Sequence, residues 1–340
     1  MSYVPELRDA PPWIMEEMVA AQPALARSLL DSPPSAVAEV AAAVRDTSGP
    51  LTVVGCGTSE HGAMAAAAQL DRALDGGWPP AVVARQSLDA VERPQQGGVC
   101  IGISHDGGTR ATQLALEAAA AGGATTVLVT SVEDAPVDWV LTTPVHDDSW
   151  CHTVAYVSSI LVGAALAREL RIEGVDGAAA AALLEAPGEV SLPVAARMIV
   201  AGAGVDLITA RELALKIAEG ARIPTSGYQL ETLLHGHLAG EDSETAGVLV
   251  QTDPAARRVA RRTGLAAAAL GEIGIPVAQI GPPPHVELDA MLARLLWGAV
   301  QLQRLTLGLA AARGMNPDLI RREDAPYARA GDVAEGAGDW

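Results

Sequence analysis

One short stretch constrains the fold of this chain more than any other. Residues 51–54 form strands readily, residues 55–59 hold two glycines and two hydroxyls, and an alanine-rich segment follows at 63–74. This order predicts a buried strand, a tight turn and the start of a helix capped by Thr58 or Ser59. The free N–H groups of such a helix attract anions, and the glycines let a ligand come close. The stretch therefore predicts an anion-binding loop, although an ordinary βα turn has a similar composition.

Length and composition limit what the chain can be. At 340 residues it is long enough for two domains, and with 49% hydrophobic but only 3% aromatic residues its core consists of Ala, Val and Leu. The net charge of −18 argues against nucleic acid as a partner, because phosphate backbones need a basic surface. No apolar stretch is long enough for a bilayer and no signal peptide is present, so we expect a cytoplasmic protein without a membrane partner. The cysteines show no metal spacing, and Cys56 is interpreted as a small buried residue.

Strands and helices alternate through the first half of the chain. Two helical segments come first, at 13–30, with Pro23 as an internal break, and at 35–45. The strands that follow are apolar throughout, as expected for strands covered on both faces. They are predicted at 51–54, 81–84, 98–103, 125–130 and 137–141, with helices at 63–74, 110–121 and 154–171. This alternation predicts a parallel sheet with helices on both faces.

The same pattern then repeats. A stretch rich in Gly and Ala, 174–188, is predicted to separate two halves. Beyond it, strands are predicted at 198–201, 248–251 and 277–280, and helices at 207–220, 255–271 and 288–313. Two copies of one α/β unit placed end to end explain this order most simply.

Particular residues resemble a known family. Residues 55–59 and 104–109 resemble the first sugar isomerase (SIS) domain of glucosamine-6-phosphate synthase-type proteins, and residues 211–219 with His235-Gly236 resemble the second. The resemblance implies an α/β fold of two tandem flavodoxin-like SIS domains, each a five-stranded parallel sheet flanked by helices. No glutaminase domain precedes them, so we expect the chain not to draw ammonia from glutamine itself. The expected divisions are an N-terminal helical segment at 1–45, the domains at 46–186 and 187–326, and a tail at 327–340.

The second half holds the candidate catalytic residues. Interconversion of aldose and ketose needs a base that moves a proton between C1 and C2, and a group that opens the sugar ring. On a helix, Glu212, Lys216 and Glu219 share one face. The resemblance implies that Glu219 is the base and that His235 opens the ring, with Lys216 and Glu212 orienting them. Alternatively, Glu212 and Lys216 form a surface ion pair, and His235 caps the end of a helix. Lys216 is the only lysine in the chain.

The resemblance also implies a phosphate site in the first half, but the chain departs from the family there. Asp106 replaces a hydroxyl that meets phosphate, and a carboxylate repels a phosphate dianion. His105 and His152 offset that charge, or they indicate a ligand other than a simple phosphosugar. The alternative is that Asp106 caps the next helix and points away, and a metal site of these three residues is a weaker alternative. The candidate ligand-binding residues are Gly57, Thr58, Ser59, Ser104, His105, Asp106, Gly107, Thr109, His152 and Thr153.

The C-terminal segment departs from the family as well. In the family it carries a lysine that reaches the sugar, whereas this chain has Arg321 and Arg322. Either arginine is a candidate substitute, with Arg322 included in the binding site. Arginine rarely gives up its proton and forms no Schiff base, which argues against full synthase-type chemistry.

Two hypotheses follow from these residues. The first is an isomerase for a sugar phosphate, or a deaminating isomerase for an amino-sugar phosphate, with no cofactor and no metal. The second is a protein that binds or senses a carbohydrate derivative without catalysis. The spacing of Glu219 and His235 favours the enzyme, whereas Asp106 counts against a standard phosphosugar. We also expect a homodimer, because the helix at 288–313 is apolar. The resemblance to SIS proteins implies that His235 of one chain then serves Glu219 of its neighbour.

Overall fold

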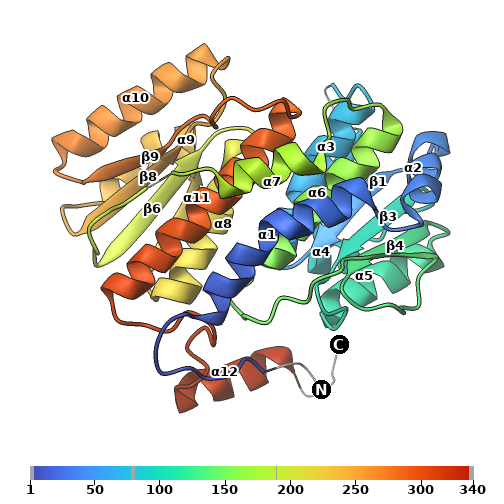
Figure 1. The fold of residues 1–340 in the computed structure, drawn as a ribbon, viewed down its shortest axis with the longest axis horizontal. Helices are drawn as coiled ribbons and strands as arrows, with labels where there is room; N and C mark the ends of the chain where they lie inside the picture. The colour runs from blue at the N-terminus through green and yellow to red at the C-terminus, as the bar shows by residue number, and fades with distance from the viewer. Residues whose placement is uncertain (1–3, 78–80, 189, 337–340) are drawn as a thin grey trace.

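Two parallel β-sheets organise the protein in the computed structural model, which describes residues 4–77, 81–188 and 190–336 (Figure 1). The strand order is β2-β1-β3-β4-β5 in the first sheet and β7-β6-β8-β9 in the second. In each sheet the strand that comes first in the chain lies inside the sheet. The next strand is added on one side of it and the following strand on the other, so the order of strand addition reverses at β1 and at β6. In sheets of this kind, ligands bind at the carboxyl ends of the strands next to that reversal.

The first sheet and its helices follow the predicted alternation closely. Its strands are β1 (Leu51–Gly55), β2 (Val82–Gln86), β3 (Val99–Ile103), β4 (Thr125–Thr130) and β5 (Trp139–Thr142). The helices of this half are α1 (Ile14–Asp31), α2 (Val37–Asp46), α3 (Thr58–Ala73), α4 (Ser87–Glu92), α5 (Arg110–Ala121), α6 (Val154–Leu170) and α7 (Gly177–Glu185).

The second sheet is built in the same way. Its strands are β6 (Arg197–Gly202), β7 (Thr225–Gln229), β8 (Thr245–Val250) and β9 (Val277–Ile280). Its helices are α8 (Asp206–Lys216), α9 (Leu230–Leu234), α10 (Arg257–Glu272), α11 (Ala290–Ala312) and α12 (Ala325–Glu335). A π-helical turn, Ile217–Ala221, continues α8, and a 3₁₀ turn, His237–Gly240, follows α9.

The strand-to-helix turn of the opening stretch occurs once in each half. A β-carbon placed on Gly55 would lie 2.3 Å from the carbonyl oxygen of Ser59, and one placed on Gly202 would lie 2.4 Å from that of Asp206. In both halves a glycine therefore ends the first strand, because the next helix begins directly against it.

The second strand of each half also leads into its helix in the same way. Gln86 and Gln229 both precede short helices with φ −65° and ψ 137°. The side chain of Gln86 accepts a hydrogen bond from Leu88 N, and that of Gln229 accepts one from Glu231 N, each at 2.6 Å. These matching caps support the interpretation of the chain as two copies of one unit.

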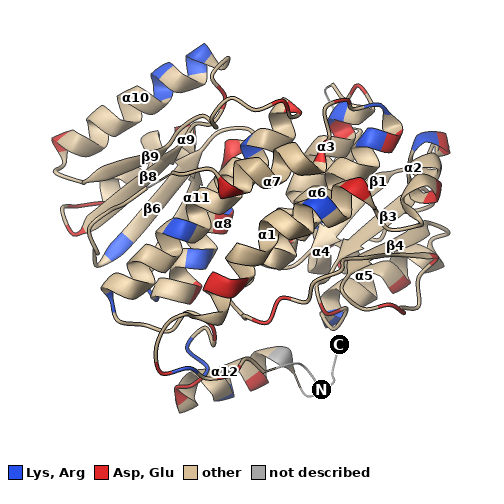
Figure 2. Ribbon diagram, viewed as in Figure 1, with Lys and Arg blue, Asp and Glu red and all other residues tan. Residues whose placement is uncertain are grey.

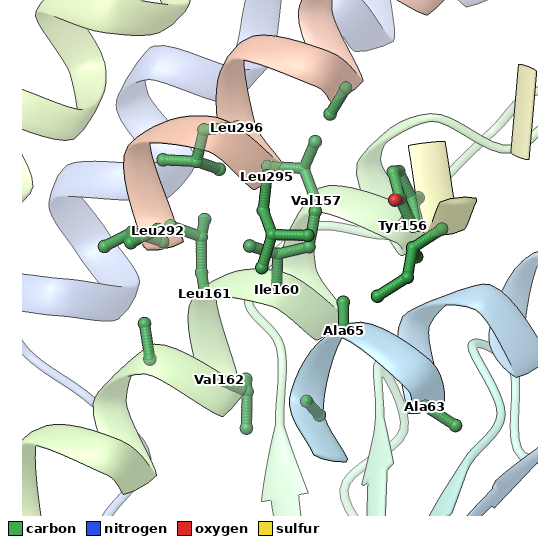
Figure 3. Packing of buried hydrophobic residues seen from close by; sticks show 14 of the residues in the cluster. Ala63, Ala65, Tyr156, Val157, Ile160, Leu161, Val162, Leu292, Leu295 and Leu296 are labelled. Atoms are coloured by element: carbon green, nitrogen blue, oxygen red, sulfur yellow. The ribbon is translucent and has the colours of Figure 1, made fainter. Parts of the chain in front are cut away.

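The main core lies among the helices between the two sheets, chiefly α1, α3, α6, α7 and α11 (Figure 1). Figure 3 shows Leu295 of α11 beside Val157 and Ile160 of α6, with small alanines of α3 on the other side. Where alanine or glycine lies at a contact between two of these helices, the backbones come close. A β-carbon on Gly163 of α6, for example, would lie 2.9 Å from the Cα of Ala66. Close helix packing thus fills a core that has few aromatic side chains.

Charged residues gather on helices and loops, whereas the strands carry almost none (Figure 2). This distribution agrees with strands that are covered on both faces. No helix in the described part of the chain has the length and apolar character needed to span a membrane.

Several expectations about the fold need correction. Helix α1 continues through Pro23 without a break, since burial of its apolar face outweighs the lost backbone hydrogen bond. The stretch at 174–188 contains helix α7, and α12 begins before the predicted tail and extends into it. Among the described residues the second sheet has four strands instead of five. The division into domains at 186 and 187 stays a prediction.

Strand β7 has no counterpart in the sequence prediction. It lies at the edge of its sheet and none of its residues is fully buried, so it carries a Ser-Gly pair in place of an apolar run. Its position is set by parallel pairing with β6, in which Thr225 lies opposite Met198.

The glycine at the first turn gives a direct test of this geometry. We expect Gly55→Ala to lower the free energy of unfolding by about 1–3 kcal/mol, because the added methyl group meets the backbone at Ser59. Gly264, inside α10, has no atom within 4 Å of an added β-carbon, so Gly264→Ala should raise stability by about 0.5–1 kcal/mol. Urea unfolding of both variants measures the two effects. Equal effects would contradict the proposed close contact.

Candidate functional site

A buried cluster of charges lies where α8 continues into the π-helical turn. The ammonium of Lys216 lies 3.7 Å from Glu212 Oε1 and donates a hydrogen bond to Glu219 Oε2. The side chains of Lys216 and Glu212 are 0% exposed, whereas that of Glu219 is 22% exposed. The surface ion pair considered for Glu212 and Lys216 is therefore wrong. Of the three groups, Glu219 is the one that solvent reaches.

The π-helical turn sets the direction of Glu219. This turn ends at Arg222, whose φ of 54° is left-handed and stops the helix. The backbone is also tightly packed at Gly220, where a β-carbon would lie 2.9 Å from Thr306 and 3.2 Å from Cys151 Sγ. A π-helical turn is wider than an α-helical turn, so it changes the directions in which its side chains point. Glu219 therefore contacts Lys216, three residues earlier, and its side chain is still partly exposed.

Two residues from the first half complete the environment of Glu212. His61 Nδ1 lies 2.6 Å from Glu212 Oε2, and Thr58 Oγ1 donates to Glu212 Oε1 at 3.3 Å. His61 has no role among the sequence-based predictions, although it lies two residues after the glycine loop. The prediction that Thr58 or Ser59 caps α3 is wrong. Gly57 takes the N-cap position with φ 57°, and no side chain caps this helix.

Burial and charge act against each other on the pKa values of the cluster. For Glu212, burial raises the pKa, but Lys216 and His61 outweigh it and the net pKa lies below the ordinary value. For Lys216, burial lowers the pKa, but the two carboxylates outweigh it and the ammonium stays charged. For Glu219, burial raises the pKa and Lys216 only partly offsets it, so the pKa lies above the ordinary range. Glu219 is thus the stronger proton acceptor of the two carboxylates.

The loop between β3 and α5 holds the next group of candidate residues. Ser104 Oγ lies 3.2 Å from Thr109 Oγ1 and accepts a hydrogen bond from Thr109 N at 3.4 Å. Asp106 is exposed, and its carboxylate accepts a hydrogen bond from Gly108 N at 2.9 Å. Gly107 has φ 68°, which permits this turn. Asp106 therefore closes its own loop and does not cap α5, whose N-cap is Thr109.

The start of helix α6 is occupied by a carboxylate of the chain itself. Asp147 is buried and accepts hydrogen bonds from Thr153 N at 2.6 Å and Ala155 N at 3.0 Å. Burial raises the pKa of Asp147. The backbone N–H of Asp147 in turn donates to His105 Nε2 at 2.6 Å. Thr153 thus contributes its backbone to an internal contact, while its buried hydroxyl has no hydrogen-bond partner among the described residues.

The two histidines of the predicted ligand pocket lie side by side. The rings of His105 and His152 are 5.5 Å apart, and that of His146 stacks on His105 at 4.7 Å. Burial lowers the pKa of His105 and of His152 to about 4 in each case. Both imidazoles are consequently neutral near pH 7 and act there as hydrogen-bonding groups without a charge.

A small pocket joins several of these elements at the carboxyl end of the first sheet. Ser59 and His105 line it together with residues of β3, β4 and α6. Gly57 lies at the same end, and a β-carbon there would lie 4.0 Å from Leu215 of α8. Cys56, between Gly55 and Gly57, is half-buried and not the buried residue expected.

Two candidate residues lie apart from these contacts. The imidazole of His235 is 73% exposed and lies at the end of α9, where it contacts Glu231 and Arg262. Among the contacts of the described residues, none joins His235 to Glu219. The guanidinium of Arg322 lies 5.0 Å above the ring of Trp150, in the loop before α6. Arg321 instead stacks on Tyr327 at 3.9 Å and pairs with Asp324.

Metal binding was a minor alternative for His105, Asp106 and His152. In the described ranges, no three or more His, Cys, Asp or Glu residues are arranged to hold a metal ion.

Comparisons with known proteins identify the fold. No protein-family model matches the chain, and neither does any curated protein. Tagatose-6-phosphate ketose/aldose isomerase from Escherichia coli matches with a TM-score of 0.75 and 18% identity, over 93% of this chain and 98% of its own. The C-terminal domain of glucosamine-fructose-6-phosphate aminotransferase from Francisella tularensis matches with a TM-score of 0.71 and 17% identity, over 92% and 99%. Glucosamine-6-phosphate deaminase from Thermotoga maritima matches with a TM-score of 0.65 and 14% identity, over 90% and 96%. The predicted α/β fold of parallel sheets flanked by helices is confirmed.

The buried cluster predicts a large effect of removing its ammonium. We expect Lys216→Met to lower the free energy of unfolding by about 3–5 kcal/mol, because it leaves Glu212 charged, buried and without its cation. Arg110→Ala breaks an ion pair of 3.1 Å on the surface and should cost no more than about 1 kcal/mol. Urea unfolding measures both.

A double variant keeps this test informative if Lys216→Met does not fold. Glu212→Gln combined with Lys216→Met removes one of the two carboxylates as well as the ammonium, so it should be more stable than Lys216→Met alone. A double variant that is less stable than the single one would show that the loss comes from packing and not from unpaired charge.

Proposed function

We propose that this protein is a sugar isomerase of the SIS type that interconverts the ketose and aldose forms of a sugar phosphate. The observation that carries the proposal is Glu219, a carboxylate with a raised pKa that reaches the surface beside a buried ammonium. The matched structures support the substrate class, since their names refer to tagatose 6-phosphate, glucosamine 6-phosphate and fructose 6-phosphate.

Glu219 is the proposed base of the proton transfer. It removes a proton from the carbon beside the carbonyl group of the open-chain sugar and returns it to the former carbonyl carbon, which regenerates the carboxylate. In the same conversion, the hydroxyl group on the first carbon gives up its proton and becomes the new carbonyl, and the former carbonyl oxygen gains a proton. Its raised pKa makes it a better acceptor than an ordinary glutamate. Lys216 keeps Glu219 in place and favours negative charge nearby, where the enediolate forms. Glu212 holds Lys216 from its other side.

The phosphate group is assigned to the end of the first sheet. Ser59, Ser104 and Thr109 offer hydroxyls there, and α5 offers the free N–H groups of its first turn. The Asp106 carboxylate is turned into its own loop and is exposed, so water screens its repulsion of a phosphate. His105 and His152 contribute polar surface without charge.

We further propose that the active unit is a homodimer. His235 is exposed and has no contact with Glu219 among the described residues of its own chain, so it is free to open the sugar ring in the neighbouring subunit. Arg322, on the ring of Trp150, takes the place of the tail lysine of the family and is proposed to contact the sugar.

An amino-sugar phosphate is the second candidate substrate, since glucosamine-6-phosphate deaminase is among the matched structures. A deaminating isomerase would release ammonia from such a substrate. Assays that detect both the isomerised sugar and ammonia separate these activities, and ligand binding without either product would favour the non-catalytic alternative.

Replacing the base tests the proposal. We expect Glu219→Gln to lower kcat by at least about 100-fold on the sugar phosphate that wild type converts, with little change in binding, because the shape of the side chain is kept. Titration calorimetry measures binding in parallel. In wild type, the rate should fall on the acid side around a pKa above the ordinary range of glutamate, since only the ionised carboxylate accepts a proton.

Glu117→Gln, in a surface ion pair of α5, is the matched control and should leave the rate unchanged. If Glu219→Gln retains more than about a tenth of the wild-type rate, Glu219 is not the base.

Mixing two inactive variants tests the homodimer. We expect Glu219→Gln and His235→Asn each to be inactive alone, and a mixed dimer of the two to recover one working site. In that dimer one site combines the intact Glu219 of one chain with the intact His235 of the other. Co-expression with two different affinity tags isolates the mixed dimer. No recovery of activity in this purified species would place both residues in one subunit.

A further inference from the structure

The start of helix α3 contacts two different groups of residues. Ser59 lines the pocket at the end of the first sheet. Thr58 and His61 instead contact Glu212 of α8, in the other half of the chain. Only 11% of the His61 side chain and 0% of the Glu212 side chain are exposed, so little water reaches their contact. This part of α3 therefore joins the proposed phosphate site to the buried cluster of charges.

The two oxygens of the Glu212 carboxylate have separate partners. Oε1 lies 3.7 Å from the Lys216 ammonium and accepts a hydrogen bond from Thr58 Oγ1 at 3.3 Å. Oε2 lies 2.6 Å from His61 Nδ1, which is its only partner among the contacts of the described residues. A buried carboxylate oxygen without a hydrogen bond is unfavourable. His61 therefore satisfies the side of Glu212 that Lys216 does not reach.

The charge of Glu212 decides where the hydrogen of this contact lies. Burial raises the pKa of Glu212, but Lys216 and His61 outweigh it, so the carboxylate is ionised at neutral pH. An ionised carboxylate only accepts hydrogen bonds. His61 Nδ1 therefore carries the hydrogen and donates it, whether the imidazole as a whole is neutral or protonated.

The ammonium of Lys216 is shared between two carboxylates. It donates a hydrogen bond to Glu219 Oε2 and lies beside Glu212. Without the donor at His61, Glu212 Oε2 would lack a hydrogen bond and would draw the ammonium away from Glu219. The imidazole thus limits the competition of the two carboxylates for one cation.

We propose that His61 is a positioning residue of the reaction, whose hydrogen bond to Glu212 leaves the lysine ammonium to hold Glu219. This inference rests on the proposed function, in which Glu219 is the base. His61 acts through the two charged residues of α8 and does not need to touch the sugar. Because α3 also carries Ser59, the contact fixes the base relative to the proposed phosphate site. A misplacement of about 1 Å between reacting groups can cost about 100-fold in rate.

Nitrogen NMR of the imidazole rings tests the contact without an assay of activity. At a pH where the His61 ring is neutral, we expect its hydrogen on Nδ1 in about tenfold excess or more. In Glu212→Gln, the two donors beside Oε1 keep the amide oxygen there, so the amide NH2 faces His61 and the hydrogen moves to Nε2. The same hydrogen position in wild type and in Glu212→Gln would overturn the inference.

A second histidine serves as the reference for this measurement. His285 Nε2 lies 3.4 Å from Glu287 Oε1, and these side chains are 92% and 95% exposed. Water competes for both groups there, so Glu287→Gln should leave the hydrogen position of His285 nearly unchanged.

Two substitutions of His61 separate positioning from proton exchange. Leucine removes the donor at Nδ1, so we expect His61→Leu to lower kcat by about 10–100-fold with little change in KM. An asparagine amide offers a donor near the position of Nδ1 but does not exchange a proton with the sugar, so His61→Asn should recover most of that loss. Gln69→Leu is the matched control and should leave the rate unchanged. Gln69 is buried on the same helix and donates to backbone carbonyls of Ala65 and Ile160.

The kinetic outcomes decide the inference separately from the proposed function. An unchanged kcat in His61→Leu, or equal losses in His61→Leu and His61→Asn, would overturn the inference, because the rate would then not depend on the donor. If His61→Leu does not fold, a loss of more than about tenfold in folded His61→Asn overturns it. These results leave the proposed function standing as long as Glu219→Gln is inactive. An active Glu219→Gln variant would refute the function even where the NMR result agrees.

Discussion

The interaction on which the rest of this structure depends is the burial of the single lysine, Lys216, between two carboxylates. An ammonium without access to water costs several kcal/mol unless charges of opposite sign lie beside it, and here Glu212 and Glu219 provide them. Glu212 in turn contacts His61 and Thr58 of α3, which belong to the other half of the chain. The cluster thus compensates a buried cation and links the helices that follow the first strand of each sheet.

The strand-to-helix turn after the first strand occurs in both halves, but the residue that follows it differs. At the position equivalent to Ser59, the second half has Asp206, whose carboxylate accepts from Thr252 N at 3.0 Å and pairs with Arg294 at 3.2 Å. In the second half, the carboxylate at this position is therefore already bound by donors from other parts of the chain. In the first half, Ser59 is small and lines a pocket with His105. This difference favours a ligand at the first sheet, with the second half supplying charged side chains.

The described residues around the end of the first sheet offer an anion hydrogen-bonding groups and no fixed positive charge. Asp147 occupies the start of α6, while His105 and His152 are neutral at pH 7 because burial lowers the pKa of each. An anionic ligand would thus meet hydroxyls and backbone N–H groups in place of a fixed cation. An anion bound in this way is held by hydrogen-bond geometry. Such binding is less sensitive to the nearby exposed charge of Asp106 than a desolvated ion pair would be.

The sequence by itself determined most of the longer local elements and their order. Strands β4 and β9 have the predicted bounds, and the common helical face of Glu212 and Lys216 follows from a spacing of four residues. The tertiary structure alone decided that this face is buried, that His61 and Thr58 contact Glu212, and that Arg262 reaches Glu231 and His235. The physical reason is that periodicity reports neighbours one or two turns apart. Burial and pKa shifts instead depend on groups that are distant in the chain, such as Thr58 and Glu212, and become neighbours only when the helices pack.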